Sequence, residues 1–383
     1  VYGVSWLVAL SGGLLVWALR APSKTRLFAT AALASIWLGG LALNQLRWTE
    51  PAGDKLRATL VQGNIPQELK WQPEQQRITL ERYVALTRQH LDSDVVVWPE
   101  TAVPAFYDQV AADFLEPLGV ELQQHGVSLL TGIPVLDRSR WHYFNAVISL
   151  DQPQRFYYKV HLVPFGEYLP LRDWLAEVLD FLPVPEADFT AGDPRQPLLS
   201  AAGYPVGASI CYEIAFGEQL IAALPEAAFL INVSNDAWFG DLLAPHQHLE
   251  MARMRARETE RYLLRATNTG VSAIIDAEGK LLVQTRQART ETISLYVRAK
   301  AAPGDPPMDE SRRRELAEEF LDMAVPPDVE PEDARAVGAT RLGMDEINAE
   351  AGANRSERLV ELAQREPSRA TERSLRKRNP VSR

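Results

Sequence analysis

Cys211 is the only cysteine in this chain of 383 residues, and its thiol is the most nucleophilic side-chain type present. It ends the run GASIC at 207–211, and Glu213 follows closely. Small apolar residues that end in a polar side chain are typical of a buried strand that delivers this side chain at its C-terminal end. A lone thiol cannot form an internal disulfide. Two interpretations remain open from this run alone: Cys211 is a small buried hydrophobe, or it is a nucleophile.

Two other apolar runs end in charged residues that complement a thiol. The run DVVVW at 94–98 leads through proline to Glu100, and RFYY at 155–158 leads to Lys159. Open α/β sheets place their ligands at strand ends. A carboxylate can accept the thiol proton, and an ammonium group can stabilise a thiolate and a tetrahedral oxyanion. Together the three residue types predict acyl transfer through a thiol. Taken singly, Glu100 could be a carboxylate at a helix N-terminus, and Lys159 a solvated charge.

Short apolar strands alternate with helical stretches over residues 56–297, which predicts an α/β layered catalytic domain. A helix is expected from Pro73 to Leu91, and a longer one from His248 to Asn268. Within the second, Met251 to Arg265 carries Arg and Glu at helical spacing, as in a partly solvated helix with i to i+4 pairs.

Residues 1–50 predict two transmembrane helices. The runs Val1–Leu19 and Leu27–Leu46 hold no charged residue, and each approaches the roughly 20 residues that cross a bilayer. The loop between them is basic, which predicts a cytoplasmic loop and a catalytic domain on the opposite face, the periplasmic side of a bacterial inner membrane. A secretory signal and a pair of buried core helices are the alternatives. Because the sequence begins at Val1, inside an apolar run, we interpret it as a fragment or a processed form.

The remaining composition excludes some classes of function. A net charge of −10 argues against a nucleic-acid partner. The pair His246 and His248 lacks a further ligand cluster, so we expect no metal and assign both to the surface or a helix cap. Residues 298–383 are charged and poor in apolar residues, and they predict a disordered or partly helical tail of unknown role, with short helices at 312–323 and 355–365.

Several motifs resemble the nitrilase (carbon–nitrogen hydrolase) superfamily and, more narrowly, the apolipoprotein N-acyltransferases. They are WPETAVP around Glu100, YYKVHLVPFGEYLP around Lys159, SICYEIAFGE around Cys211, VQGNIPQELKW at 61–71, LINVSNDAWFG at 230–240 and the segment 245–276. The resemblance covers about residues 1–297. It implies a nitrilase-like α-β-β-α sandwich behind the last two spans of a membrane domain.

The resemblance also implies roles for individual residues. Glu100 would be the general base, Lys159 the oxyanion stabiliser and Cys211 the nucleophile. The supporting residues would be Glu167 near the lysine, Glu213 lining the site, and Tyr212, whose backbone N–H would be a second oxyanion donor. Trp71, Tyr212 and Trp238 lie in matching motifs and would shape an acyl or headgroup pocket, or serve in ordinary aromatic packing.

The implied reaction needs no cofactor. Cys211 would take an acyl chain from a phospholipid, phosphatidylethanolamine in this family, and pass it from the thioester to the N-terminal amine of a diacylglyceryl-cysteine apolipoprotein. The family pattern has a final strand and a returning span where this chain has the charged segment from 298 onward. Two other hypotheses stay open: a membrane-tethered amidase or nitrilase with the same triad, and an inactive truncated copy that acts as an interaction protein.

Overall fold

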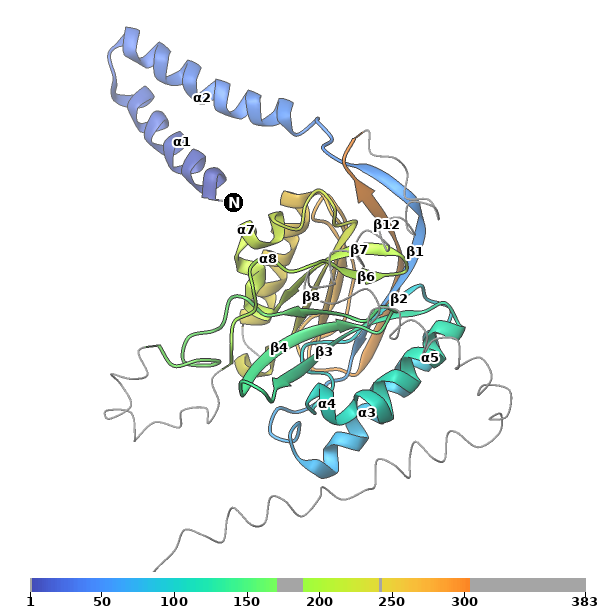
Figure 1. Ribbon diagram of the computed structural model, residues 1–383. Helices are drawn as coiled ribbons and strands as arrows, with labels where there is room; N and C mark the ends of the chain where they lie inside the picture. The colour runs from blue at the N-terminus through green and yellow to red at the C-terminus, as the bar shows by residue number, and fades with distance from the viewer. Residues whose placement is uncertain (1, 171–188, 241–242, 304–383) are drawn as a thin grey trace, which may run out of the picture.

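Two six-stranded sheets pack face to face at the centre of the domain, and helices cover their outer faces (Figure 1). The structure, a computed structural model, describes residues 2–170, 189–240 and 243–303. The predicted α-β-β-α sandwich behind two apolar helices is therefore confirmed.

The first sheet has the strand order β12-β1-β2-β3-β4-β5. Its strands are β1 (Glu50–Gln62), β2 (Val95–Val97), β3 (Ser128–Asp137), β4 (His142–Ser149), β5 (Arg155–Tyr158) and β12 (Glu291–Ala301). The neighbours β1, β2 and β3 run parallel, and the outer pairs run antiparallel. All three residues of β2 are buried, as expected of an all-valine strand that is covered on both faces.

The second sheet has the order β11-β10-β9-β8-β7-β6. Its strands are β6 (Leu199–Ala201), β7 (Tyr204–Ile210), β8 (Phe229–Ser234), β9 (Leu263–Thr267), β10 (Ala273–Ile275) and β11 (Leu281–Gln284). Here β7, β8 and β9 form the parallel centre. Parallel strands present their carboxyl ends at one edge, so the residues after β7 and β8 lie close together.

Three apolar clusters hold the four layers together. One fills the space between the sheets, with Val97 and Leu130 facing Ile210 and Phe229. A second packs the first sheet against the helices on its outer face, and a third packs α8 against the second sheet. The helical elements of the domain are α3 (Pro73–Thr87), η1 (Arg88–His90), α4 (Tyr107–Val110), η2 (Ala111–Leu115), α5 (Glu116–Gln124), η3 (Cys211–Ala215), α7 (Gly217–Ile221), η4 (Asp236–Phe239) and α8 (Ala244–Thr259).

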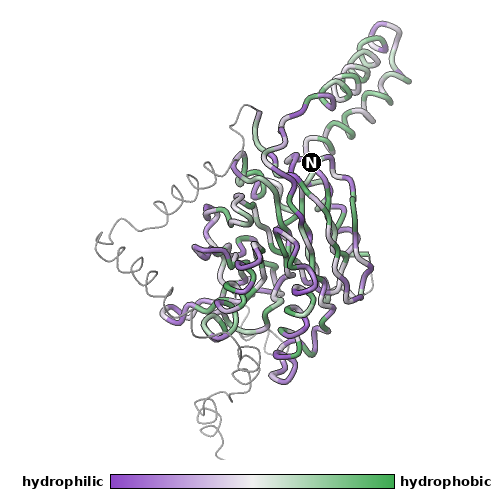
Figure 2. The backbone as a smooth tube through the Cα atoms, turned by 90° about the vertical axis from the view of Figure 1, so that its right-hand side faces the viewer, coloured by the Kyte–Doolittle hydropathy of each residue, from purple (hydrophilic) through white to green (hydrophobic). Residues whose placement is uncertain are grey.

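Two apolar helices precede the domain and extend away from it (Figure 1). These helices, α1 (Tyr2–Arg20) and α2 (Ser23–Leu43), are long and apolar enough to cross a membrane. Figure 2 shows that hydrophobic residues predominate along both. Only 17% and 6% of their apolar windows are buried, which contradicts the alternative of two buried core helices.

One predicted helix is wrong in its second half. Helix α8 ends at Thr259, Glu260 adopts the left-handed conformation, and the chain then enters strand β9. Leucine and arginine are good helix formers, but Leu263 and Leu264 are fully buried in a central strand, and tertiary burial overrides local propensity. Strand β9 pairs with β8 and β10 in the second sheet, so the residues predicted as the second half of a helix form a strand of this sheet.

The end of the domain also differs from the expected pattern. Strand β12 reaches Ala301, beyond the expected boundary at 297, and pairs with β1 along nearly its whole length. The final strand that the family pattern contains is therefore present. The two expected tail helices lie outside the described residues.

Gly132 in β3 allows the strand to approach the backbone that carries Glu100. A Cβ atom at this position would lie 2.5 Å from the amide nitrogen of Thr101 and 2.6 Å from the Cα atom of Glu100. We expect Gly132→Ala to lower the free energy of unfolding by about 1–3 kcal/mol, because backbone atoms must shift to make room. Thermal unfolding measures this.

Gly119→Ala is the matched control. Its Cβ would meet Leu150 at an ordinary contact distance of 3.4 Å, and the position lies inside helix α5. Alanine favours a helix over glycine, so this variant should keep or slightly raise the stability. Equal melting temperatures for the two variants would contradict the close approach at Gly132.

Candidate active site

Glu100, Lys159 and Glu167 form a buried charged cluster at the end of the first sheet. The Lys159 ammonium donates to Oε1 of Glu167 at 2.6 Å and lies 4.0 Å from Oε1 of Glu100. The side chain of Lys159 is 1% exposed. The structure thus brings together the two predicted triad residues of the first sheet, with Glu167 beside the lysine as expected.

Cys211 stands at a sharp turn between strand β7 and the short helix η3. Its φ angle is +53°, a conformation that non-glycine residues adopt rarely and that the surrounding structure must enforce. The turn stops the strand abruptly and leaves Cys211 at the strand end as a partly exposed residue. A strained strand-to-helix turn of this kind presents a nucleophile to a substrate in other hydrolase folds.

Glu213 connects the two halves of the cluster. Its carboxylate accepts hydrogen bonds from the backbone N–H groups of Val160, His161 and Ile210 at 2.6, 3.0 and 2.7 Å. Tyr157 and Gln219 donate to the same carboxylate at 3.0 Å each. Because Val160 follows Lys159 and Ile210 precedes Cys211, Glu213 fixes both residues across the sandwich. It is fully buried, so it positions the site from behind instead of lining it as expected.

Three further residues contact Glu100. Asn145 donates to its Oε1 at 2.7 Å, and the backbone N–H of Asn235 donates to its Oε2 at 2.8 Å. The buried Lys70 donates to the carbonyl oxygen of Glu100 at 3.3 Å. None of these three contacts was predicted from the sequence. A polar asparagine inside the apolar strand YFNAVISL was the available signal for Asn145.

The charges of this cluster are coupled. Burial raises the pKa of Glu100, and the nearby Glu167 raises it further, while Lys159, Asn145 and Lys70 oppose the rise. Burial disfavours the ammonium form of Lys159, but Glu100, Cys211 and Glu167 outweigh this effect and raise its pKa. Lys159 is therefore a permanent cation, whereas the ionised form of Glu100 is less favoured than that of an ordinary glutamate.

The thiol of Cys211 is protonated at rest. Burial and the charge of Glu100 raise its pKa to about 12, and Lys159 offsets them only in part. A nearby cation alone would lower the pKa of a thiol, as the sequence suggested. Here two carboxylates share that cation, so a preformed thiolate is disfavoured. The thiol needs a base at the moment of attack, and Glu100 is the candidate.

An apolar cavity of about 590 Å³ lies beside the cluster, lined by the segments that follow Lys159 and Cys211. Tyr212 lines it and is 40% exposed, and its ring meets Phe216 edge-on at 5.3 Å. Phe216 in turn stacks on His161, with ring centroids 4.0 Å apart. Tyr212 is also the second residue of η3, where backbone N–H groups lack acceptors within the helix. Its role as an oxyanion donor stays a prediction.

Neither of the two tryptophans predicted to shape the pocket has a described side chain on the wall of this cavity. Trp71 ends the turn that carries Lys70 and is 54% exposed, and it does not line this cavity. Trp238 lies in η4, and its side chain is outside the described residues. Their pocket roles remain predictions.

The histidine assignment is half wrong. His246 is exposed, but His248 is buried, with Nδ1 3.1 Å from Oδ1 of Asp236. Donor atoms of Cys211, Asp236 and His248 lie within 4.8 Å of one another, a set that suits a metal ion by residue type. However, Asp236 already accepts hydrogen bonds from Ser234 and the buried Arg265, and this arginine supplies the positive charge that an ion would bring.

The family model for carbon–nitrogen hydrolases matches residues 57–300, and the chain belongs to this family. Among curated relatives, it is 55% identical over 280 residues to the apolipoprotein N-acyltransferase of Methylococcus capsulatus, covering 73% of this chain and 56% of that protein. It is 44% identical to the apolipoprotein N-acyltransferase of Nitrosomonas europaea, covering 74% and 57%. The resemblance drawn from the motifs is confirmed.

The chain spans about half the length of these curated relatives. Among solved structures, it is similar to XC1258 from Xanthomonas campestris, a CN-hydrolase superfamily protein with an arsenic adduct in its active site. That match has a TM-score of 0.48 and 18% identity, and it covers 73% of this chain and 99% of the other.

Glu213→Gln should destabilise the domain and slow alkylation of Cys211 by iodoacetamide. An amide nitrogen would face at least two N–H or O–H donors that now point at a carboxylate oxygen, and each bond to a charged group contributes roughly 1.5–3 kcal/mol. Thermal unfolding and the alkylation rate measure the two effects. Glu218→Gln, at an exposed position of α7, is the control and should resemble the wild type. Similar behaviour of both variants would contradict the positioning role.

Asn145→Ala should shift the pH dependence of Cys211 alkylation. Asn145 stabilises ionised Glu100, so its loss should raise the pKa of Glu100 further above the ordinary value of 4.5. Because we expect Glu100 to accept the thiol proton only when ionised, the rate is lost as pH falls through this pKa, and the acid limb should move to higher pH. The pH dependence of Cys211 alkylation in the unfolded chain, where Glu100 is not near the thiol, is the reference for both proteins. An unmoved acid limb would exclude Glu100 as the base.

Proposed function

We propose that this chain is the catalytic portion of a membrane-bound N-acyltransferase that moves a fatty acyl chain from a phospholipid to a lipoprotein amine through a thioester on Cys211. The observation that carries the proposal is the thiol at a strained turn between a buried carboxylate–ammonium pair and an apolar cavity. The names of the relatives support this substrate class over a small amide.

The first half-reaction follows from the charges. As the sulfur of Cys211 attacks the ester carbonyl, Glu100 takes the thiol proton. Lys159 stabilises the oxyanion of the tetrahedral intermediate, together with the N–H of Tyr212. When the intermediate collapses, the ester C–O bond breaks, and Glu100 returns the proton to the departing lysophospholipid oxygen.

The second half-reaction uses the same groups in the same order. The N-terminal amine of a diacylated lipoprotein attacks the thioester carbonyl, and Glu100 accepts a proton from the amine. The C–S bond then breaks, an amide forms, and the proton returns to the thiolate of Cys211. A shared covalent intermediate predicts ping-pong kinetics.

The apolar cavity supports an acyl chain as the transferred group. It lies directly after both Lys159 and Cys211, and aromatic and aliphatic side chains line most of it. A hydrocarbon chain gains roughly 0.8 kcal/mol for each buried CH₂ group, whereas a small polar amide would gain nothing there. Phosphatidylethanolamine is the proposed donor.

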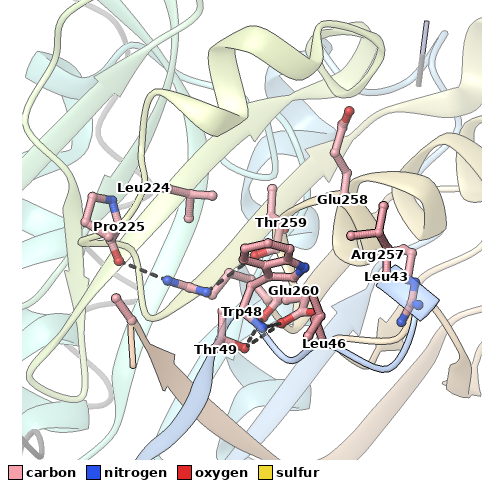
Figure 3. A pocket seen from close by; sticks show the side chains of 12 residues that line it. Leu43, Leu46, Trp48, Thr49, Leu224, Pro225, Arg257, Glu258, Thr259 and Glu260 are labelled. Carbon is pink, nitrogen blue, oxygen red and sulfur yellow. Dashed lines mark hydrogen bonds between the residues drawn. The ribbon is translucent and has the colours of Figure 1, made fainter. Parts of the chain in front are cut away.

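The connection to the apolar helices supports a site close to a bilayer surface. A cavity of about 350 Å³ lies where the chain leaves α2, with Leu46 and Trp48 on its wall (Figure 3). Glu260 at the end of α8 accepts hydrogen bonds from the N–H of Trp48 at 2.9 Å and the hydroxyl of Thr49 at 3.3 Å. The exposed indole of Trp48 suits the membrane–water interface. We assign the membrane to the bacterial inner membrane and the domain to its periplasmic face.

Cys211→Ala should abolish transfer of label from phosphatidylethanolamine to the protein and on to a diacylated lipopeptide. The thiol is the only described group that can form the thioester. Mass spectrometry of the acylated protein and lysolipid release measure the two steps, and Cys211→Ser should retain the fold. Wild-type labelling of the alanine variant would overturn the proposal.

A panel of small amides tests the alternative. Hydrolysis of an amide without lysolipid release would identify a tethered carbon–nitrogen hydrolase, and a folded protein whose thiol reacts with neither class would identify an inactive copy.

A further inference from the structure

A half-buried histidine, His161, lies on the wall of the apolar cavity beside the charged cluster. It belongs to the motif YYKVHLVPFGEYLP, and the proposed reaction does not use it. Its ring stacks on Phe216, with ring centroids 4.0 Å apart, and its backbone N–H donates to Glu213 at 3.0 Å. Glu213 also accepts the N–H of Ile210, the residue before the nucleophile, at 2.7 Å. His161 is therefore held close to the turn that presents the thiol.

The hydrogen bonds around the ring fix which nitrogen of His161 carries a hydrogen. Nδ1 faces Oε1 of Gln219. The amide of Gln219 cannot be reversed, because its Nε2 donates to the carboxylate of Glu213 at 3.0 Å and to the hydroxyl oxygen of Tyr157. Tyr157 gives its own hydrogen to Glu213 at 3.0 Å, so its oxygen needs a donor. Oε1 of Gln219 must then face the histidine, and Nδ1 must be the N–H.

Nε2 of neutral His161 is consequently a hydrogen-bond acceptor. A neutral imidazole has one N–H, and Nδ1 holds it. Nε2 makes no hydrogen bond to another residue in the described part of the chain. Because Nδ1–H keeps Gln219 as its partner in both states, Nε2 can gain and lose a proton without any rotation of the ring.

The second half-reaction has one proton more to move than the first. A peptide α-amine has an ordinary pKa of about 7.7–8.0, so near neutral pH most of the acceptor is an ammonium group without a lone pair. Of its three N–H hydrogens, one stays in the amide, one passes through Glu100 to the sulfur of Cys211, and one must leave. The exchange of an ester with a thiol releases no proton. A second base is therefore needed when the amine attacks.

His161 is the one basic side chain among the described residues that line the cavity, since the others are aromatic, aliphatic or proline. The nearby carboxylates are engaged. Glu213 accepts five hydrogen bonds, and Glu167 accepts the ammonium of Lys159 at 2.6 Å. The buried Lys70 does not line the cavity. Nε2 of His161 is thus the proton acceptor that an amine in the cavity meets.

We propose that His161 binds the acceptor amine through Nε2 and removes its extra proton, which frees the lone pair that attacks the thioester. The proton passes from the amine nitrogen to Nε2 and then to solvent, because the side chain is only half-buried. Glu100 moves the other proton to Cys211 as before. The inference rests on the proposed function and names the recognised group as a primary ammonium. Phosphatidylethanolamine also carries one, but only the attacking amine has to lose its proton.

The test separates the two half-reactions of the full chain in detergent micelles. His161→Asn keeps an N–H donor for Gln219 and lacks Nε2. In ping-pong kinetics, kcat/KM for each substrate reports its own half-reaction. We expect kcat/KM for a diacylated lipopeptide to fall roughly a hundredfold or more, the effect of losing a general base. The value for phosphatidylethanolamine should stay close to that of the wild type.

Hydroxylamine distinguishes a base from a residue that only shapes the cavity. It is mostly neutral near neutral pH, so its attack on a thioester needs no removal of an extra proton. The acyl-enzymes of the wild type and of His161→Asn should react with it at the same rate.

Two further variants complete the experiment. His161→Phe keeps a ring against Phe216 and should show the same loss with the lipopeptide, and it covers the case in which His161→Asn does not fold. His125→Asn, at an exposed position after α5, is the control and should resemble the wild type.

The outcomes that overturn the inference differ from those that reject the proposed function. An unchanged kcat/KM for the lipopeptide, equal losses in both half-reactions, or an equal loss with hydroxylamine would overturn the role of His161. A loss confined to phosphatidylethanolamine would assign His161 to the donor headgroup and overturn it as well. A wild-type protein that forms no acyl-enzyme would reject the proposed function itself, and this inference with it.

Discussion

The carboxylate of Glu213 is the interaction on which the site depends. It joins the end of β5 in one sheet to the end of β7 in the other, through backbone N–H groups on both sides. Lys159 and Cys211 each follow the last residue of a strand, and Glu213 bonds to the backbone of the residue next to each of them. The two oxygens of the Glu213 carboxylate accept five hydrogen bonds, and three of them come from backbone N–H groups. The carboxylate therefore links the backbones of the two strands directly.

The second constraint is the charge balance of the buried site. Glu100, Glu167 and Asp236 bring three carboxylates, against the ammonium groups of Lys159 and the buried Lys70 and the guanidinium of Arg265. Adding a thiolate would leave the cluster with excess negative charge in a medium of low dielectric constant. The thiol therefore stays protonated, and its proton must move to Glu100 as the new bond forms. This arrangement protects a lone thiol from unproductive reactions, because oxidation and alkylation proceed through the thiolate.

The sequence predicted the elements that depend on local pattern and missed those that depend on tertiary contacts. Glu100, Lys159 and Cys211 could be found because each ends an apolar strand. The role of Glu213 could not, because two of its backbone partners, Val160 and His161, lie 53 and 52 residues away in the chain. Strand β9 was mistaken for helix because burial, and not propensity, decides its conformation.

The same distinction applies to His248. A histidine on a polar helix is normally at the surface, and only the fold brings Asp236 to it. Asn145 and Asn235 were missed for a related reason, since their hydrogen bonds to Glu100 cross from one element to another. Sequence patterns therefore identify the candidate catalytic residues. The groups that hydrogen-bond to them and shift their pKa values are identified only from the three-dimensional structure.

Under the proposed function, membrane attachment explains why a hydrolase scaffold would transfer an acyl chain instead of hydrolysing it. An acyl chain seated in the apolar cavity beside Cys211 occupies space that water would otherwise use to approach the thioester. The short link through Trp48 and Thr49 is bonded to the end of α8, so the domain cannot drift far from the helices. Donor and acceptor are both anchored in the same bilayer, which raises their effective concentration at the site above that in free solution. The amine of a membrane-anchored lipoprotein can then outcompete water for the thioester of Cys211.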